Sequence, residues 1–167
     1  MINRIISGGQ TGADRAALDF ALHAGIECGG WVPKGRMAED GIIPARYPNL
    51  IETDSEDPKM RTELNVRDSD GTLLVTRGIP GGGSAFTLEF ATRLGKPLLR
   101  VDLERESSEL ATGRVLLWVY DVHPSTLNVA GSRASEDPEI YDLTKAVLEG
   151  VFLAMNSKNN MRTGLQQ

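Results

Sequence analysis

Residues 72–84 read TLLVTRGIPGGGS, and this stretch decides the fold. Its first five residues are β-branched or apolar, which is typical of a central parallel strand that helices cover on both faces. Three glycines, Gly81–Gly83, follow the strand, and Ser84 is suited to cap a helix that runs to Leu94. Gly95-Lys96-Pro97 is a strong signal for the end of that helix. The stretch therefore predicts a buried strand, a glycine turn and a covering helix.

The rest of the chain alternates between strand and helix patterns in the same way. Further strands are predicted at 4–7, 50–53, 98–101 and 126–130, and further helices at 14–24, 57–67, 107–119 and from Pro138, with Asp137 as its cap. Strands that alternate with helices pair in parallel through right-handed crossovers. We therefore expect a doubly wound, Rossmann-like α/β domain with a mainly parallel sheet of about five to six strands.

This single domain is expected to cover residues 1–156, followed by a polar C-terminal tail, residues 157–167, that frays from Asn156. Residues 29–49, GGWVPKGRMAEDGIIPARYPN, differ from the rest because they show little periodicity. A long segment without regular structure in a small domain is often functional. We therefore expect this segment to be functional.

Charge and composition limit the partners. The 167 residues carry a net charge of −5, so no basic field attracts nucleic acid or an anionic membrane, and neither is expected as a partner. Cys28 is the single cysteine, which excludes an intrachain disulfide, and no metal-ligand cluster is visible. The N-terminal residues lack the apolar run of a signal peptide, and a cytoplasmic protein is expected.

Glycine-bearing loops follow three of the predicted strands. Ligands of open α/β sheets bind beyond the carboxyl ends of the strands, which places these loops at the expected site. The first loop, residues 7–15, reads SGGQTGADR and opens a helix, whose exposed N–H groups are suited to an anion. It matches neither a P-loop nor the G-x-G-x-x-G spacing of dinucleotide folds. The alternative is a tight turn with Asp14 as a helix cap.

The second loop, residues 78–87, repeats this arrangement with its three consecutive glycines, and a flexible turn is the alternative. The third, residues 128–135, contains Arg133, which could hold a phosphate through two parallel hydrogen bonds. Arg77, Lys34 and Arg36 also lie beside predicted loops. For each cation alone, a solvated surface charge is the alternative.

Catalytic groups are harder to assign. The candidate carboxylates are Asp14, Glu39, Asp40 and Glu89, and each has a structural alternative as a cap, a solvated charge or a subunit contact. His23 and His123 lie away from the predicted strand ends. No catalytic residue is therefore predicted.

Four runs carry a resemblance to a known family. They are GGQTGADRAALDFAL, GGWVPKGRMAEDGIIPARYP, GGGSAFTLEFA and LNVAGSRASEDPEIY, and they cover nearly the whole chain. In these runs the chain resembles the molybdenum-cofactor carrier family, which is similar to a wider superfamily of Rossmann-like proteins, the cytokinin-activating phosphoribohydrolases (lysine-decarboxylase-like proteins) among them. The resemblance implies a homodimer or a dimer of dimers, and molybdenum cofactor as a bound cargo. Trp31 could then stack on the pterin, with a core or subunit contact as the alternative.

The phosphoribohydrolases share the signature Pro-Gly-Gly-x-Gly-Thr-x-x-Glu, in which the Glu serves catalysis. Here the glycine run is one residue shorter and Thr87 stands at the position three after Ser84, while Glu89 lies further round the helix. The departure favours binding over hydrolysis. We therefore expect a protein that binds or carries a phosphate-bearing small molecule, molybdenum cofactor (molybdopterin) or a related nucleotide-like ligand. The alternatives are N-glycosidic hydrolysis of a nucleotide derivative and a structural oligomer with a vestigial site.

The candidate ligand-binding residues come from the three loops and the cations beside them. They are Gly8, Gly9, Gln10, Thr11, Gly12, Asp14, Arg15, Lys34, Arg36, Arg77, Gly81, Gly82, Gly83, Ser84, Thr87, Asn128, Gly131 and Arg133.

Overall fold

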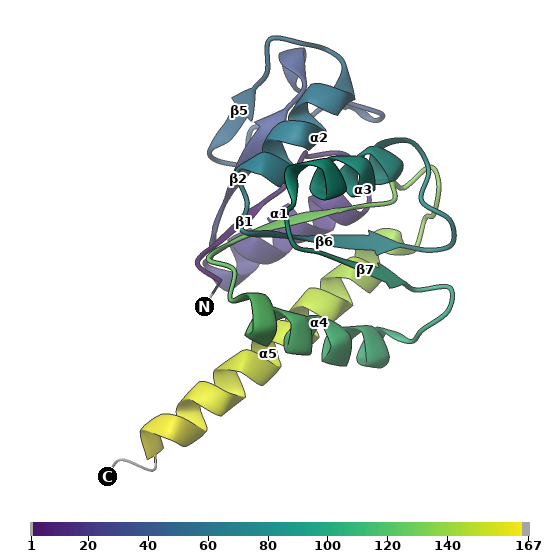
Figure 1. Cartoon of the computed structure of the whole chain (residues 1–167). Helices are drawn as coiled ribbons and strands as arrows, with labels where there is room; N and C mark the ends of the chain where they lie inside the picture. Colours follow the sequence, from purple (N-terminus) through teal and green to yellow (C-terminus); the bar gives the residue numbers. More distant parts are fainter. Residues whose placement is uncertain (1, 165–167) are drawn as a thin grey trace.

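The computed structural model describes residues 2–164, and Figure 1 shows a sheet with helices on both of its faces. The sheet contains β1 (Arg4–Ile6), β2 (Glu27–Val32), β5 (Leu50–Glu52), β6 (Gly71–Thr76), β7 (Leu98–Asp102) and β8 (Thr126–Gly131). Its six strands lie in the order β5-β2-β1-β8-β6-β7, and every pair is parallel. The predicted doubly wound, Rossmann-like fold is confirmed.

The helices form two layers. They are α1 (Ala13–Ala24), α2 (Pro58–Arg67), α3 (Gly82–Leu94), α4 (Ser108–Val122) and α5 (Ile140–Gly164). The contacts pair α2 with α3, and α5 with both α1 and α4, so the two groups cover opposite faces of the sheet (Figure 1). Between these layers β6 is buried at every position, as its uninterrupted apolar pattern predicts. Within the described residues, no helix has the length and apolarity that a membrane crossing requires.

The segment 29–49 is more ordered than we predicted. Its start belongs to β2, and it continues through a 3₁₀ turn (Lys34–Arg36) into a small antiparallel hairpin of β3 (Met37–Ala38) and β4 (Gly41–Ile42). Two glycines hid β2 from the sequence pattern. A Cβ on Gly30 would lie 2.4 Å from the carbonyl oxygen of Ser7, so the close approach of β1 to β2 requires a glycine there.

Three helix starts also differ from the prediction. Gly12, not Asp14, is the N-cap of α1, and Gly81, not Ser84, is the N-cap of α3, which places Ser84 inside the first turn. The last helix begins at Ile140 rather than Pro138, because Asp137 Oδ1 accepts a bond from Glu139 N (3.0 Å) in a turn that precedes the helix. This helix runs to Gly164, so the tail that we expected to fray at Asn156 is helical as far as residue 164.

Candidate functional site

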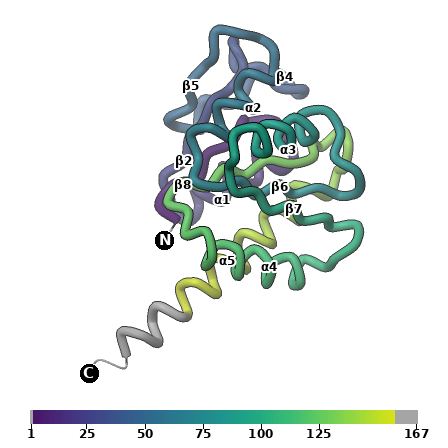
Figure 2. Tube along the Cα trace, viewed as in Figure 1, coloured from purple at the N-terminus to yellow at the C-terminus, as the bar shows by residue number. Residues whose placement is uncertain are grey.

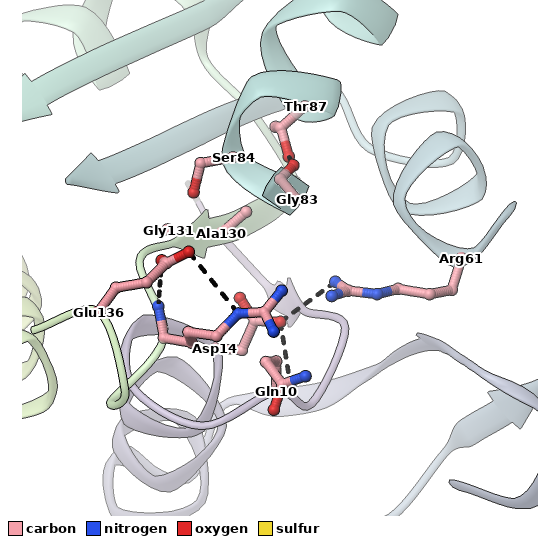
Figure 3. A pocket seen from close by; sticks show the side chains of 10 residues that line it. Gln10, Asp14, Arg61, Gly83, Ser84, Thr87, Ala130, Gly131 and Glu136 are labelled. Carbon is pink, nitrogen blue, oxygen red and sulfur yellow. Dashed lines mark hydrogen bonds and ion pairs between the residues drawn. The ribbon is translucent and has the colours of Figure 1, made fainter. Parts of the chain in front are cut away.

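The three glycine loops meet at the carboxyl edge of the sheet. They follow β1, β8 and β6, which are neighbours in the sheet. A polar cavity of about 20 Å³ lies between them, with room for roughly one water-sized group (Figure 3). Its lining residues are Gln10, Asp14, Arg61, Gly83, Ser84, Thr87, Ala130, Gly131, Arg133 and Glu136.

The first turn of α3 presents unpaired donors beside this cavity. No side chain caps the helix, and the amides of Ser84 and Ala85 bond to the carbonyl of Gly81. Among the described residues, the amides of Gly82 and Gly83 have no hydrogen-bond partner. Gly82 adopts φ +44°, a conformation that favours glycine. The helix N-terminus therefore offers free N–H groups and the positive end of the helix dipole.

Two buried side-chain atoms at the cavity also lack a partner among the described residues. They are Ser84 Oγ and Arg61 Nε. Ser84 is only 4% exposed and lines the cavity with Arg61 (Figure 3). A buried polar group without a hydrogen bond costs about 1–3 kcal/mol, so such groups usually have a ligand or water in the functional state.

Arg61 was missing from the sequence prediction. It lies on α2, reaches the loop after β1, and its Nη1 donates to Asp14 Oδ2 at 3.2 Å, while the amide of Gln10 donates to the same oxygen at 3.2 Å. Burial raises the pKa of Asp14 and outweighs the lowering effect of Arg61 and the hydrogen bonds. Gly8 makes room for this arginine, since a Cβ there would lie 1.8 Å from Arg61 Nη1.

Arg133 comes from the loop after β8, as predicted, and its side chain is 34% exposed. Its Nη2 lies 3.7 Å from the position that a Cβ on Gly82 would occupy. Two carboxylates flank the guanidinium, Glu39 at 3.9 Å from Nη1 and Glu136 at 3.8 Å from Nε. Both distances exceed hydrogen-bonding range, so the guanidinium is near two anions but bonded to neither.

A larger cavity of about 190 Å³ adjoins the first and shares Gln10, Arg61 and Arg133 with it. Its remaining lining residues are Gly8, Pro33, Met37, Ala38, Glu39, Glu56 and Pro58. Met37 and Ala38 of β3, with Glu39 of the turn after it, form one wall. The hairpin lies at the end of the molecule that also holds β5 (Figure 2). The two neighbouring cavities together are called the cleft.

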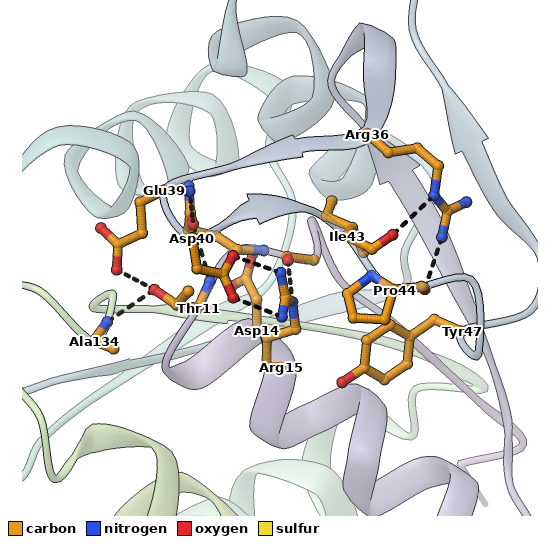
Figure 4. A network of polar contacts seen from close by, with 12 residues as sticks. Thr11, Asp14, Arg15, Arg36, Glu39, Asp40, Ile43, Pro44, Tyr47 and Ala134 are labelled. Carbon is orange, nitrogen blue, oxygen red and sulfur yellow. Dashed lines mark hydrogen bonds and ion pairs between the residues drawn. The ribbon is translucent and has the colours of Figure 1, made fainter.

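Charged side chains fix the hairpin over the cleft (Figure 4). The Glu39 carboxylate accepts bonds from Thr11 Oγ1, from Ser135 N at 3.1 Å and from Ser135 Oγ at 2.6 Å. The neighbouring Asp40 forms a bidentate pair with Arg15, at 3.0 and 3.2 Å. Although burial acts to raise it, the pKa of Glu39 is lowered by the bonds from Ser135 and Thr11. Glu39 and Asp40 therefore both have partners within the protein, although Asp40 stays half exposed to solvent.

Several candidate residues shape the loops instead of lining the small cavity. Arg15 Nε donates to Gly9 O at 2.6 Å, and a Cβ on Gly12 would lie 2.5 Å from Ser132 O. Gly9 carries a positive φ of +73° and packs against Ile43. The first loop thus uses much of its own hydrogen-bonding capacity within the protein.

Other candidates lie away from both cavities. Asn128 is buried and donates to Thr72 Oγ1 at 3.1 Å. Arg36 donates to the carbonyls of Ile43 (3.2 Å) and Pro44 (3.1 Å), and Lys34 is exposed. Arg77 pairs with Asp137 and Glu139. Trp31 Nε1 donates to Asp68 at the far end of α2, and Trp31 lines neither cavity, so neither observation supports the expectation that it stacks on a ligand.

Catalytic groups remain unassigned in the structure. Thr87 lines the small cavity and is 2% exposed, whereas Glu89 lies on the exposed face of α3. The described part of the chain holds no group of three His, Cys, Asp or Glu residues arranged to bind a metal ion.

Fold and site together define a Rossmann-like α/β domain with a polar cleft at the carboxyl edge of its sheet. Residues 5–152 match the circularly permutated YpsA SLOG family, and the chain belongs to this family. A solved structure, described as a putative molybdenum carrier protein from Syntrophus aciditrophicus SB, is 53% identical with a TM-score of 0.87. The match covers 90% of this chain and 94% of that one. No curated protein matches the sequence. The family resemblance is therefore confirmed.

Proposed function

We propose that the protein binds and carries a small molecule through a phosphate or a similar oxyanion, which contacts the N-terminus of α3. One observation carries this proposal. The uncapped first turn of α3 lies beside Ser84 Oγ, a buried hydroxyl without a partner in the described structure. An anion at this position would satisfy the free amides of Gly82 and Gly83 together with that hydroxyl.

The charges around the cavity support the same ligand. A protein with a net charge of −5 does not attract anions over its whole surface, so local donors must hold them. Asp14 is paired with Arg61. Arg133 is bonded to neither Glu39 nor Glu136, so its guanidinium is the cation of this cavity that can donate to the ligand. The small cavity has room for one oxygen of the anion. The adjoining cavity of about 190 Å³ has room for part of an organic group.

The cargo we propose is molybdenum cofactor or a related nucleotide-like ligand. The relative from Syntrophus aciditrophicus is described as a molybdenum carrier, and its likeness to this chain supports a cargo of that kind. Molybdenum cofactor carries a phosphate, which would bind at α3, and a pterin, which would extend into the larger cavity. Carriage is favoured over turnover because Thr87, which lines the cavity, stands at the sequence position where the phosphoribohydrolase signature has its glutamate.

Native mass spectrometry tests the proposal directly. We expect protein purified gently from its host to retain a small oxyanion-bearing molecule. Calorimetry with AMP, inorganic phosphate and molybdate should then show saturable binding. Ser84→Ala should weaken this binding by about tenfold, the value of roughly one hydrogen bond to a charged group.

Ser125→Ala is the matched control, because Ser125 precedes β8 and therefore lies at the opposite edge of the sheet. It should leave the affinity unchanged. A protein that retains no small molecule and binds none of the three anions would overturn the proposal.

A further inference from the structure

The Glu39 carboxylate is held by groups that would suit a free anion. Its donors are Thr11 Oγ1, the amide of Ser135 and the hydroxyl of Ser135, and Arg133 Nη1 lies 3.9 Å away. These groups come from the loops after β1 and β8, at the ligand-binding edge of the sheet. Two hydroxyls, an amide and a guanidinium form an anion-binding position, and a side chain of the protein occupies it.

This position adjoins the one at α3 through Arg133. The Nη2 atom of that arginine faces Gly82, 3.7 Å from the position of a Cβ, while Nη1 faces Glu39. Arg133 also lines both cavities, and Glu39 lines the larger one. One guanidinium therefore borders two anion positions in the same cleft.

The Glu39 carboxylate is not the only contact that holds the hairpin. The backbone amide of Glu39 donates to Gln10 Oε1 at 2.9 Å, and Asp40 holds Arg15 through two bonds. The carboxylate could therefore leave its donors while the hairpin keeps its place. Its side chain is 21% exposed, so water can solvate it after such a move.

We propose that the ligand carries two anionic groups, and that the second displaces Glu39 from Thr11, Ser135 and Arg133 and binds in its place. This inference rests on the proposed function, because the first anionic group binds at α3. The ligand class is then a small molecule with two phosphates, or a phosphate and a carboxylate, joined by a short spacer. Glu39 is an internal substitute for the second group.

Calorimetry with inorganic phosphate and tripolyphosphate tests this inference. Glu39→Ala empties the second position, so we expect the variant to bind two phosphates where the wild type binds one. Tripolyphosphate, which can span both positions, should bind the variant at least about tenfold more tightly than the wild type. Glu39→Gln removes the charge with little change of shape and should shift the affinity in the same direction.

Asp40→Ala is the matched control, because it removes a hairpin contact without emptying the anion position. It should keep one phosphate and the wild-type affinity for tripolyphosphate. If both Glu39 variants bind a single phosphate with unchanged affinity and gain nothing for tripolyphosphate, the second position is refuted and the α3 site stands. If neither the wild type nor any variant binds phosphate, both proposals fail.

Discussion

Asp14 Oδ2 lies 3.2 Å from Arg61 Nη1, and the two side chains are only 4% and 9% exposed. The pair joins α1 to α2 across the carboxyl edge of the sheet, at the floor of the cleft. A buried ion pair contributes little net stability, because desolvation offsets the attraction. Breaking it by removing one partner is costly, since the other charge stays buried without compensation. Removal of one partner should therefore cost more stability than removal of both, and this difference can be measured.

Arg61→Met should destabilise the fold by about 3–5 kcal/mol near neutral pH, because it leaves the Asp14 carboxylate unpaired. Burial already raises the pKa of Asp14 above 3.8, and loss of Arg61 raises it further. A carboxyl group whose pKa is raised in the folded state contributes to stability at pH values below its unfolded-state pKa. This contribution is lost as the pH rises through the folded-state pKa. The loss should therefore grow with pH. Urea unfolding at several pH values measures it.

The double variant Asp14→Asn with Arg61→Met completes a thermodynamic cycle for this pair. It should recover much of the lost stability, since it removes both charges. A loss for Arg61→Met that does not change with pH would show that packing, rather than the unpaired carboxylate, sets the cost.

Arg133→Lys should weaken phosphate binding by about 1–3 kcal/mol, because lysine cannot make the planar two-bond contact with an oxyanion. Calorimetry with inorganic phosphate measures the change. Arg93→Lys is the control, since Arg93 pairs with Glu63 on the surface at 2.6 Å and lines neither cavity. Equal affinity in the two variants would show that Arg133 acts as a general surface charge.

Gly131→Ala should destabilise the fold by at least about 2 kcal/mol. A Cβ there would lie 2.0 Å from the carbonyl oxygen of Val75, which belongs to the neighbouring strand and cannot move freely. Gly25→Ala provides the comparison, because Gly25 has a φ of +67° but nothing within 4 Å of its Cβ position. That variant should lose only about 1 kcal/mol from backbone strain. Urea unfolding measures both variants, and an equal loss of unfolding free energy in Gly131→Ala and Gly25→Ala would contradict the packing argument.

The fold followed from local patterns, whereas part of the site depends on contacts that no local pattern reveals. The buried run at 72–76 and the glycines after it correctly predicted β6 and the turn into α3. Gly29 and Gly30 hid β2, because the reason for them is the approach of other backbone segments. The pattern could not distinguish a glycine that a neighbouring strand requires from a glycine in a loop.

Arg61 escaped prediction for a related reason. The helix α2 has little amphipathic character, and an arginine within it is ordinarily a surface residue. Glu39 was considered as a carboxylate, but its donors, Thr11 and Ser135, are distant in sequence. Only the folded chain brings these residues together.

The Ser135 amide should report the ionisation of Glu39. The pKa of Glu39 is lowered from its ordinary value of 4.5, so the ionised carboxylate stabilises the folded state at pH values above 4.5. This contribution is lost as the pH falls through the folded-state pKa. In NMR titrations the Ser135 amide resonance should shift with a midpoint below 4.5. The shift should vanish in Glu39→Gln. A midpoint at or above 4.5 would contradict the hydrogen bonds that hold the carboxylate.

The last prediction is that the protein binds nucleotide-like ligands without turning them over. Cleavage of an N-glycosidic bond needs a carboxylate or another group placed to activate water or to stabilise charge on the sugar. Thr87 fills the expected position, and its hydroxyl donates to Gly83 O at 2.9 Å. Glu89 is on the exposed face of α3, and Asp14 is engaged by Arg61 and Gln10.

Incubation with a panel of nucleoside monophosphates, followed by chromatography, should therefore show binding but no release of base. Neither Asp14→Asn nor Glu89→Gln should release base, and Glu89→Gln should also leave binding unchanged, because Glu89 lines neither cavity. Asp14→Asn is the stricter test of the two, because the Asp14 carboxylate lines the cavity where a ligand would bind. Release of base by the wild type that disappears in Asp14→Asn would identify this carboxylate as a catalytic group. The cleft would then be the active site of a hydrolase whose catalytic residue differs from the glutamate of the phosphoribohydrolase signature, and the carrier proposal would be wrong.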